Sequence, residues 1–241
     1  MDFLMVYMGS KRRIKGKLVP ILQDYIDENG IETYIEPMVG GGNIIDSVSC
    51  RNRVGYDAHK YLIALLKEVS QDGGACIPDD ISREEYMAVK ANPDAYPDWY
   101  VGMVGFCSSF GGKWMAGHAG RYKGTGKSRV NEMLRNLKKQ APSLKGIQFD
   151  CRAYRDICVP EGSLVYIDPP YRSTTAYKGT PAIDYEDLYD WIRAISQKCK
   201  VFVSEYQMPP DFKVVAEFPQ LTQLCDDKSK QFTSVEKVFT L

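Results

Sequence analysis

The sequence feature that most constrains the fold is a short apolar run that ends in an acid, two prolines and an aromatic residue. Residues 164–167 read Leu-Val-Tyr-Ile, which is typical of a buried strand, and Asp168, Pro169, Pro170 and Tyr171 follow directly. Each proline ring holds φ at about −65°, so the backbone beyond the strand is rigid. The segment therefore places one carboxylate, one rigid turn and one aromatic face at a strand end. A proline-rich turn that only terminates the strand is the alternative interpretation.

This arrangement suits chemistry on an amine attached to a heteroaromatic ring. Such an amine is a poor nucleophile, because its lone pair is delocalised into the ring. The Asp168 carboxylate and the Pro169 carbonyl can both accept its N–H bonds, which would localise the lone pair for attack. Tyr171 can stack on the ring and present its π-face to a neighbouring sulfonium cation. We therefore interpret residues 168–171 as a candidate catalytic segment.

Length and composition are typical of a globular α/β protein. The 241 residues suit one α/β domain, or a core with a modest insertion. Residues 1–9 lack the features of an export signal and no run of 18 apolar residues occurs, so we expect a cytoplasmic protein with no membrane span. The seven cysteines include no C-x-x-C pair, which favours reduced thiols. With only His59 and His118, the chain lacks a zinc ligand set, and no metal is expected.

Short apolar runs alternate with helical stretches along most of the chain. We expect strands at residues 34–39, 53–57, 147–150, 164–167, 201–204 and 235–241, and helices at 43–48 and 58–69. A strand, a glycine turn, a helix and a second strand form a right-handed βαβ unit, which predicts a parallel sheet. Residues 72–144 contain no convincing strand pair. We therefore predict a catalytic α/β domain built from residues 1–71 and 145–241, with a mainly helical domain at 72–144 inserted in it.

A glycine-rich element follows the first expected strand. Residues 36–42 read Glu-Pro-Met-Val-Gly-Gly-Gly, and glycines at a strand–helix turn let a ligand approach the backbone, although a glycine triplet alone is equally typical of a loop. Asp57 strengthens the signal, because it ends the next strand 15 residues after Gly42, where an acid can hydrogen-bond ribose hydroxyls. Together they predict a nucleoside-bearing ligand. Gly126-Lys127-Ser128 is no P-loop, since Arg121 stands where that motif needs glycine.

A net charge of zero hides two basic zones. Residues 11–17 hold five cations and no acid, and residues 113–145 hold nine cations against Glu132 alone, so the rest of the chain is acidic. This pattern is typical of a protein that meets a polyanion with one face. Solvated surface charge is the alternative, which the interleaved aromatic and glycine residues disfavour. The cations that we assign to DNA contact are Arg12, Lys113, Arg121, Lys123, Lys127 and Arg129.

The order of these elements resembles the D12-class, Dam-like DNA N6-adenine methyltransferases, and most closely their phage-type members. The resemblance covers nearly the whole chain. It rests on Tyr7-x-Gly9-Ser10-Lys11 as the N-terminal aromatic and G-G/S-K element, Glu36-Pro37-x-x-Gly40-Gly41-Gly42 as E-P-F-x-G-x-G, Asp57 as the acidic ribose position, Asp168 to Tyr171 as the catalytic tetrapeptide, and Val203-Ser204-Glu205-Tyr206 as the later S-x-Y strand.

The resemblance implies a Rossmann-like, S-adenosylmethionine-dependent methyltransferase sheet with an inserted DNA-recognition domain. It implies direct methyl transfer to N6 of an adenine rotated out of double-stranded DNA, with no metal. Asp168, Pro169, Pro170 and Tyr171 would be catalytic, with Asp168 an acceptor more than a strong base, because a carboxylate of pKa about 4 cannot deprotonate a neutral aryl amine. The implied cofactor contacts are Tyr7, Lys11, Glu36, Gly40, Gly42, Asp57, Asp150 and Asp168. Within this set Lys11 suits the methionine carboxylate, and Asp150 the adenine ring.

The recognition sequence and any protein partner are not predicted. Bacterial Dam enzymes that methylate GATC carry N-G-x-x-R-x-N in the inserted domain, whereas residues 106–114 here read Phe-Cys-Ser-Ser-Phe-Gly-Gly-Lys-Trp. Three alternatives remain open. The same fold can methylate cytosine N4, RNA or a protein amide, which Asp168 in place of Ser or Asn disfavours. A non-enzymatic DNA-binding relative would have lost Lys11 or Asp57, and a different nucleotide-binding protein leaves Tyr171 unexplained.

Overall fold

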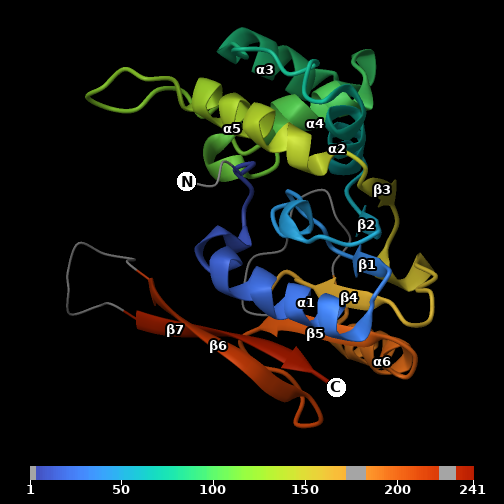
Figure 1. Ribbon diagram of the computed structural model, residues 1–241. Helices are drawn as coiled ribbons and strands as arrows, with labels where there is room; N and C mark the ends of the chain where they lie inside the picture. Colours follow the sequence, from blue (N-terminus) through green and yellow to red (C-terminus); the bar gives the residue numbers. More distant parts are fainter. Residues whose placement is uncertain (1–3, 172–182, 223–231) are drawn as a thin grey trace.

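The computed structural model describes residues 4–171, 183–222 and 232–241 (Figure 1). In these residues seven strands form one sheet in the order β3-β2-β1-β4-β5-β7-β6. The strands are β1 (Thr33–Glu36), β2 (Asn52–Asp57), β3 (Gln148–Cys151), β4 (Leu164–Ile167), β5 (Lys200–Glu205), β6 (Lys213–Thr222) and β7 (Phe232–Thr240). Strands β1 to β5 are parallel, and β7 is antiparallel to both of its neighbours. The predicted mixed α/β fold with a mostly parallel sheet is confirmed.

The helices lie on both sides of the sheet and above its edge. Those in the described residues are α1 (Lys15–Asn29), α2 (Lys60–Asp72), α3 (Arg83–Ala91), α4 (Asp98–Cys107), α5 (Arg129–Leu144) and α6 (Tyr185–Ser196). Short 3₁₀ turns connect them: η1 (Lys11–Arg13), η2 (Ile45–Ser47), η3 (Pro93–Ala95), η4 (Phe110–Gly112) and η5 (Tyr154–Asp156). In Figure 1, α3, α4 and α5 gather with α2 at the top of the molecule, while α1 and α6 lie beside the strands.

The central strands are buried on both faces because a helix covers each side. Tyr166 of β4 and Phe202 of β5 belong to the core that α1 completes. Their sequence neighbours Val165 and Val203 belong to the core on the other face, which α6 completes. Successive side chains of a strand point to opposite faces, so a strand buried on both sides is apolar throughout. This explains the continuous apolar run at residues 164–167.

The predicted elements differ from the observed ones at a strand, at a helix and at the edge of the sheet. The expected strand at 34–39 ends at Glu36, since Pro37 has no N–H to continue the ladder, and the expected helix at 43–48 is only the 3₁₀ turn η2. Strand β6 was not predicted, because Pro219 and a register shift between Val214 and Ala216 interrupt its alternation. As β6 is an edge strand, the proline is tolerated. The other expected strands are present within a few residues of their predicted bounds.

The segment between α2 and β3 is mainly helical, as the sequence predicts. Helix α4 packs along α2, and both contact α5. One hydrophobic core joins these helices to the sheet, with Leu18 of α1, Leu66 of α2, Val104 of α4 and Leu137 of α5 among its buried members. The segment at 72–144 therefore shares its core with the rest of the chain, and its status as a separate recognition domain stays a prediction.

The crossing of α2 and α4 leaves no room for a side chain at Gly102, where a Cβ would overlap the Tyr61 carbonyl oxygen. We expect Gly102→Ala to lower the free energy of unfolding by about 1 to 3 kcal/mol, because the two helices would have to move apart. Urea unfolding followed by circular dichroism measures the change. Gly16→Ala is the matched control, since Gly16 lies in α1 with nothing within 4 Å of an added Cβ. An equal loss in both variants would contradict the close crossing.

Candidate active site

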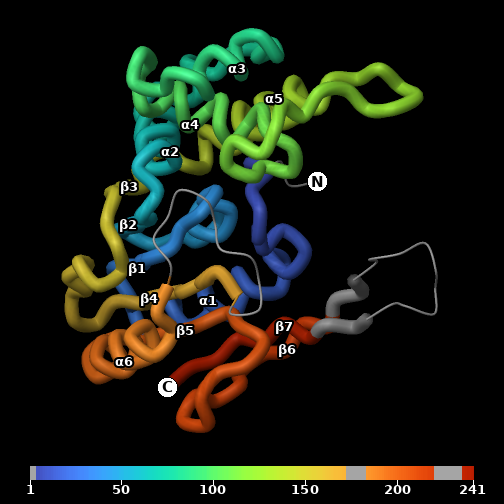
Figure 2. The backbone as a smooth tube through the Cα atoms, turned by 180° about the vertical axis from the view of Figure 1, so that it is seen from behind, coloured from blue at the N-terminus to red at the C-terminus, as the bar shows by residue number. Residues whose placement is uncertain are grey.

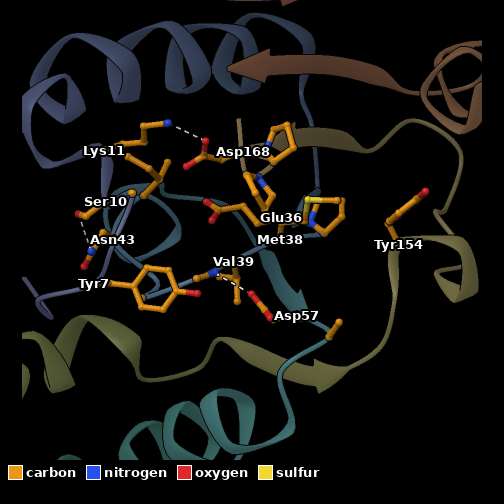
Figure 3. Close-up of a pocket in the computed structure, with 18 of the residues that line it drawn as sticks. Tyr7, Ser10, Lys11, Glu36, Met38, Val39, Asn43, Asp57, Tyr154 and Asp168 are labelled. Atoms are coloured by element: carbon orange, nitrogen blue, oxygen red, sulfur yellow. Dashed lines mark hydrogen bonds and ion pairs between the residues drawn. The ribbon is translucent and has the colours of Figure 1, made fainter. Parts of the chain in front are cut away.

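A cavity of about 400 Å³ lies at the C-terminal ends of β1, β2 and β4. Ligands of parallel α/β sheets bind at this edge. Figure 3 shows Lys11 and Asp168 together at one end of the cavity and Asp57 at the other, with Glu36 between them. The predicted site residues that line it are Tyr7, Lys11, Glu36, Gly40, Asp57, Lys113, Asp168, Pro169, Pro170 and Tyr171.

Asp57, the last residue of β2, ties the glycine-rich loop to the sheet. Its carboxylate accepts hydrogen bonds from the backbone N–H groups of His59 at 2.9 Å and Gly40 at 3.2 Å. Burial raises the pKa of Asp57 to about 6, against the opposing effect of these hydrogen bonds. Gly40 has a φ of 50°, a left-handed conformation that favours glycine. A carboxylate is thus held at the cavity wall, where it can accept hydrogen bonds from the hydroxyls of a ribose.

Tyr7 packs directly on the glycine-rich loop. A Cβ at Gly40 or Gly41 would come within 2.9 Å of the Tyr7 side chain, so only glycine leaves room for the ring. The ring also contacts Phe106 of α4, with centroids 5.6 Å apart. The glycines therefore allow an aromatic side chain, and not only a ligand, to approach the loop.

A buried ion network occupies the other end of the cavity. Lys11 Nζ lies 2.7 Å from Asp168 Oδ1 and 3.0 Å from Glu236 Oε1. It also donates to the Tyr171 hydroxyl and lies 4.3 Å from the centre of the Tyr171 ring. The ammonium group thus has three oxygen partners, two of them carboxylates. Contact between Lys11 and a methionine carboxylate stays a prediction.

Burial and the neighbouring charges have opposing effects on the pKa values of Lys11 and Asp168. Burial favours the neutral amine of Lys11, but the negative charges of Asp168 and Glu236 outweigh it and raise the pKa of Lys11. Burial also raises the pKa of Asp168 to about 6; the Lys11 charge opposes this rise and the Glu236 charge adds to it. At neutral pH the lysine is therefore charged and Asp168 is ionised, close to the pH at which it takes up a proton.

Aromatic side chains surround the turn that follows Asp168. The Tyr171 and Tyr206 rings lie with their centroids 4.5 Å apart and their planes inclined by 52°. The Tyr185 hydroxyl of α6 donates to the Pro170 carbonyl, which fixes the turn from the opposite side. A planar heteroaromatic ring bound here would contact the rings of Tyr171 and Tyr206 beside the Asp168 carboxylate.

Glu36, the last residue of β1, lies between the two ends of the cavity. Its side chain is buried, and it accepts a hydrogen bond from the Tyr34 hydroxyl at 2.8 Å. Burial raises the pKa of Glu36 well above its ordinary range. Burial therefore favours the protonated form of this carboxyl group over its charged form.

Two predicted cofactor contacts are not among the described residues that line the cavity. The Cβ position of Gly42 points toward Leu144 of α5, 3.3 Å away. The exposed Asp150 carboxylate pairs with Lys67 at 3.3 Å and with Arg152 at 2.7 Å. The structure therefore does not bring these two residues to the rest of the site, and their roles stay predictions.

Sequence reasoning missed two buried polar residues behind the cavity. Glu236 of β7 is 3% exposed and belongs to no motif, so its only signal was a charge within an apolar strand. Gln140 of α5 is 2% exposed; its Nε2 donates to the Gly41 and Gly42 carbonyls at 3.3 Å, and its Oε1 accepts from the Met5 N–H at 2.8 Å. A glutamine on the apolar face of an amphipathic helix could have indicated it.

Four predicted DNA-binding cations lie in residues 120–129, a hairpin that projects from the body and includes the first residue of α5 (Figures 1 and 2). Tyr122 N–H donates to the Lys127 carbonyl at 2.9 Å, and Arg129 N–H donates to the Gly120 carbonyl at 3.0 Å. The Arg129 guanidinium lies over the Tyr122 ring, 4.5 Å from its centre. The cationic side chains that remain exposed on the hairpin are Arg121, Lys123 and Lys127.

The other two predicted DNA-binding cations lie apart from the hairpin. Lys113 is exposed and lines the cavity. Arg12 is exposed on η1. The six cations therefore fall at three places, with one of them at the cavity itself.

Three further features concern the described part of the chain. None of its helices is long and apolar enough to cross a membrane. It holds no group of three or more histidine, cysteine, aspartate or glutamate side chains placed to bind a metal ion. Its cysteines are free thiols.

Comparison with known proteins identifies the family. The model of the D12 class N6 adenine-specific DNA methyltransferases matches residues 7–101 and 99–208. The Type II methyltransferase M.FokI of Planomicrobium okeanokoites is 24% identical over 190 residues, which make up 70% of this chain and 29% of M.FokI. The chain thus spans less than a third of that relative. The sheet agrees with the Rossmann-like fold of such enzymes, and the family implies S-adenosylmethionine as cofactor and DNA as substrate. This chain therefore belongs to the D12 class of N6 adenine-specific DNA methyltransferases, as its motifs predict.

Proposed function

We propose that this protein transfers the methyl group of S-adenosylmethionine to N6 of an adenine rotated out of double-stranded DNA. The observation that carries the proposal is the meeting of Asp57, the glycine-rich loop and the Asp168 tetrapeptide in one cavity. The family match supports adenine as the base and DNA as the polymer. We place the protein in the cytoplasm, where bacterial or phage DNA lies.

Single-molecule sequencing of DNA from cells that express the chain tests this function. We expect N6-methyladenine at one sequence context, and none in cells that express the Asp168→Ala variant. The same data report the recognition sequence. Methylation of cytosine N4, or unmodified DNA together with methylated RNA or protein, would show that a different substrate is used.

The cavity suits S-adenosylmethionine in size and in the chemistry of its walls. Its volume of about 400 Å³ is that of a pocket for a ligand of this size. Asp57 would accept hydrogen bonds from the ribose hydroxyls, and Tyr7 would contact the ligand beside the loop. Asp168 and Tyr171 lie at the end suited to the sulfonium, because a carboxylate and an aromatic face both favour a cation. The bound cofactor supplies an electrophilic methyl group.

Asp168 would act on the target amine as a charged hydrogen-bond acceptor. Lys11 engages its Oδ1, which leaves Oδ2 for one N–H of the amine, and the Pro169 carbonyl accepts the other. The nitrogen lone pair is thereby localised toward the methyl carbon. As the carbon–nitrogen bond forms and the carbon–sulfur bond breaks, the amine becomes cationic and releases one proton, which Asp168 can take. Rotation of the base costs about a few kcal/mol, which stacking on Tyr171 and phosphate contacts offset.

The tetrapeptide makes the first prediction about activity. Asp168→Ala should abolish methyl transfer, because no side-chain acceptor remains, and Asp168→Asn should keep only a trace, because its amide oxygen accepts without charge. Tyr171→Phe keeps the ring face but loses the hydroxyl that Lys11 contacts, so its rate should lie between those of the wild type and Tyr171→Ala, which should lose about 1 to 3 kcal/mol of stacking. Single-turnover transfer from labelled cofactor measures these rates, with folding checked by circular dichroism. A folded Asp168→Ala variant with the wild-type rate would refute the assigned role.

The second prediction about activity concerns Asp57 and the binding of the cofactor. Asp57→Asn should weaken cofactor binding by about 1 to 3 kcal/mol, since the charged acceptor for the ribose hydroxyls is lost. The pKa values of Asp57 and Asp168 are both about 6 in the free protein, so each carboxylate gains a proton as the pH falls through 6. Below pH 6, log kcat/KM for cofactor should therefore decrease with a slope that approaches about 2 per pH unit in the wild type. In Asp57→Asn, where one of the two carboxylates is missing, the slope should approach about 1. Identical slopes, or wild-type affinity by calorimetry, would contradict the ribose role.

The third prediction concerns the basic hairpin and the binding of DNA. Reversal of two charges in the Arg121→Glu, Lys127→Glu variant should weaken binding to every DNA sequence and reduce the salt slope of log Kd by about 2. Cofactor affinity should stay unchanged. The matched control is Arg51→Glu with Lys198→Glu, two exposed cations that precede β2 and β5 at the sheet edge away from the cavity. If the control pair has the same effect, the hairpin is no specific DNA contact.

A further inference from the structure

We propose that Glu236 is a positioning residue for methyl transfer: it anchors the Lys11 ammonium group, so that Lys11 occupies one oxygen of Asp168 and leaves the other for the target amine. This inference rests on the proposed function. Glu236 lies beyond residues 7–208, the part of the chain that the family model matches, so its role is not given by the family resemblance.

The first support is the geometry around the ammonium group. Lys11 Nζ is held by three oxygens from separate positions: Asp168 and Tyr171 after β4, and Glu236 on β7. The lysine side chain is long and flexible, and burial leaves it few other polar partners. Without the Glu236 carboxylate, the ion pair at 3.0 Å would be lost, and the ammonium could shift to cover both oxygens of Asp168. The acceptor that the amine requires would then be occupied.

The second support is the rigidity of Glu236 itself. Strand β7 is paired on both sides, with Val238 opposite Ser204 of β5 and Glu236 opposite Phe218 of β6. The Glu236 side chain is 3% exposed, so water competes little for its carboxylate. A charge fixed to the interior of a sheet can define the position of a flexible lysine. Lys11 is not needed to order β7, because the backbone hydrogen bonds to β5 and β6 already hold this strand in place.

The third support is electrostatic. Several ionisable groups face Asp168 from the elements around it. They are Lys11 of η1, Glu36 of β1, Tyr166 of β4, Tyr171 in the turn after β4, and Glu236 of β7. The negative charge of Glu236 raises the pKa of Asp168, and the positive charge of Lys11 lowers it. Removal of the Glu236 charge would leave Lys11 to act on Asp168 alone. Asp168 would then ionise at lower pH, an effect that loss of packing alone would not produce.

Glu236→Gln tests the inference, because it keeps the shape of the side chain and removes its charge. We expect the single-turnover rate at saturating cofactor and DNA to fall about 10- to 100-fold, in line with the effect of a small misplacement of a reacting group. The dissociation constants for S-adenosylmethionine and DNA should change less than about threefold. Glu217→Gln is the matched control, since this exposed carboxylate on β6 pairs with Lys237 at 3.0 Å and does not contact Lys11. It should keep the wild-type rate.

A titration that needs no activity separates this inference from the proposed function. The ¹³C signal of the Asp168 carboxyl group, assigned from the Asp168→Asn spectrum, should titrate at lower pH in Glu236→Gln than in the wild type. Glu236→Asp keeps the charge but draws it back, so it should titrate near the wild-type pH and still transfer slowly. This second variant serves if Glu236→Gln does not fold.

Two results would overturn the role of Glu236. One is a Glu236→Gln variant with the wild-type rate and the wild-type titration of Asp168. The other is a defect confined to cofactor affinity, with the rate at saturation unchanged, which would make Glu236 part of the cofactor site. If the wild type itself methylates no DNA adenine, the proposed function fails, and the titration still decides whether Glu236 controls Asp168.

Discussion

The buried ammonium group of Lys11 is the interaction on which the site depends. It joins η1 to the turn after β4 and to β7, three parts of the chain that are far apart in the sequence. One cation between two carboxylates leaves a buried negative charge, which is unfavourable in a poorly solvated place. The protein meets that cost in part through Asp168, whose pKa rises to about 6. The carboxylate that faces the cavity is therefore ionised at neutral pH, but near the point of taking up a proton, as a group that receives one from its substrate requires.

The sheet explains why this network faces Asp57 across one cavity. Because β1, β2 and β4 are parallel, their C-terminal ends meet at the same edge, and each ends in or leads into an acid: Glu36, Asp57 and Asp168. Burial of these three acids raises the pKa of each. The three differ in their partners: a tyrosine hydroxyl for Glu36, backbone N–H groups for Asp57 and an ammonium for Asp168. Acidic residues at three neighbouring strand ends are thus held in three different chemical environments.

What the sequence could predict was local. An apolar run followed by Asp168 and two prolines marks a strand end whatever lies around it, and the order of strands and helices gives the parallel sheet. The sequence could not predict which residues contact them, because those contacts depend on which surfaces meet after folding. Glu236 sits in a strand that pairs with the unpredicted β6, so no local pattern connects it to Lys11. Asp150 is a different case: its place at a strand end predicts a site residue, its carboxylate pairs with Lys67 and Arg152, and its role stays a prediction.

Helix α5 shows why the site and the helical segment form one physical unit. Its N-terminal end carries the basic hairpin, and three turns later Gln140 reaches the glycine-rich loop and the backbone of Met5 just before Tyr7. One buried carboxamide thus fixes both the loop on which Tyr7 packs and the segment that leads to it. A helix is stiff over this length, so the hairpin that is proposed to meet DNA is rigidly connected to the loop that is proposed to hold the cofactor. Since Gln140 makes these hydrogen bonds from inside residues 72–144, that segment supports the glycine-rich loop at the cavity as well as carrying the cations that are proposed to contact DNA.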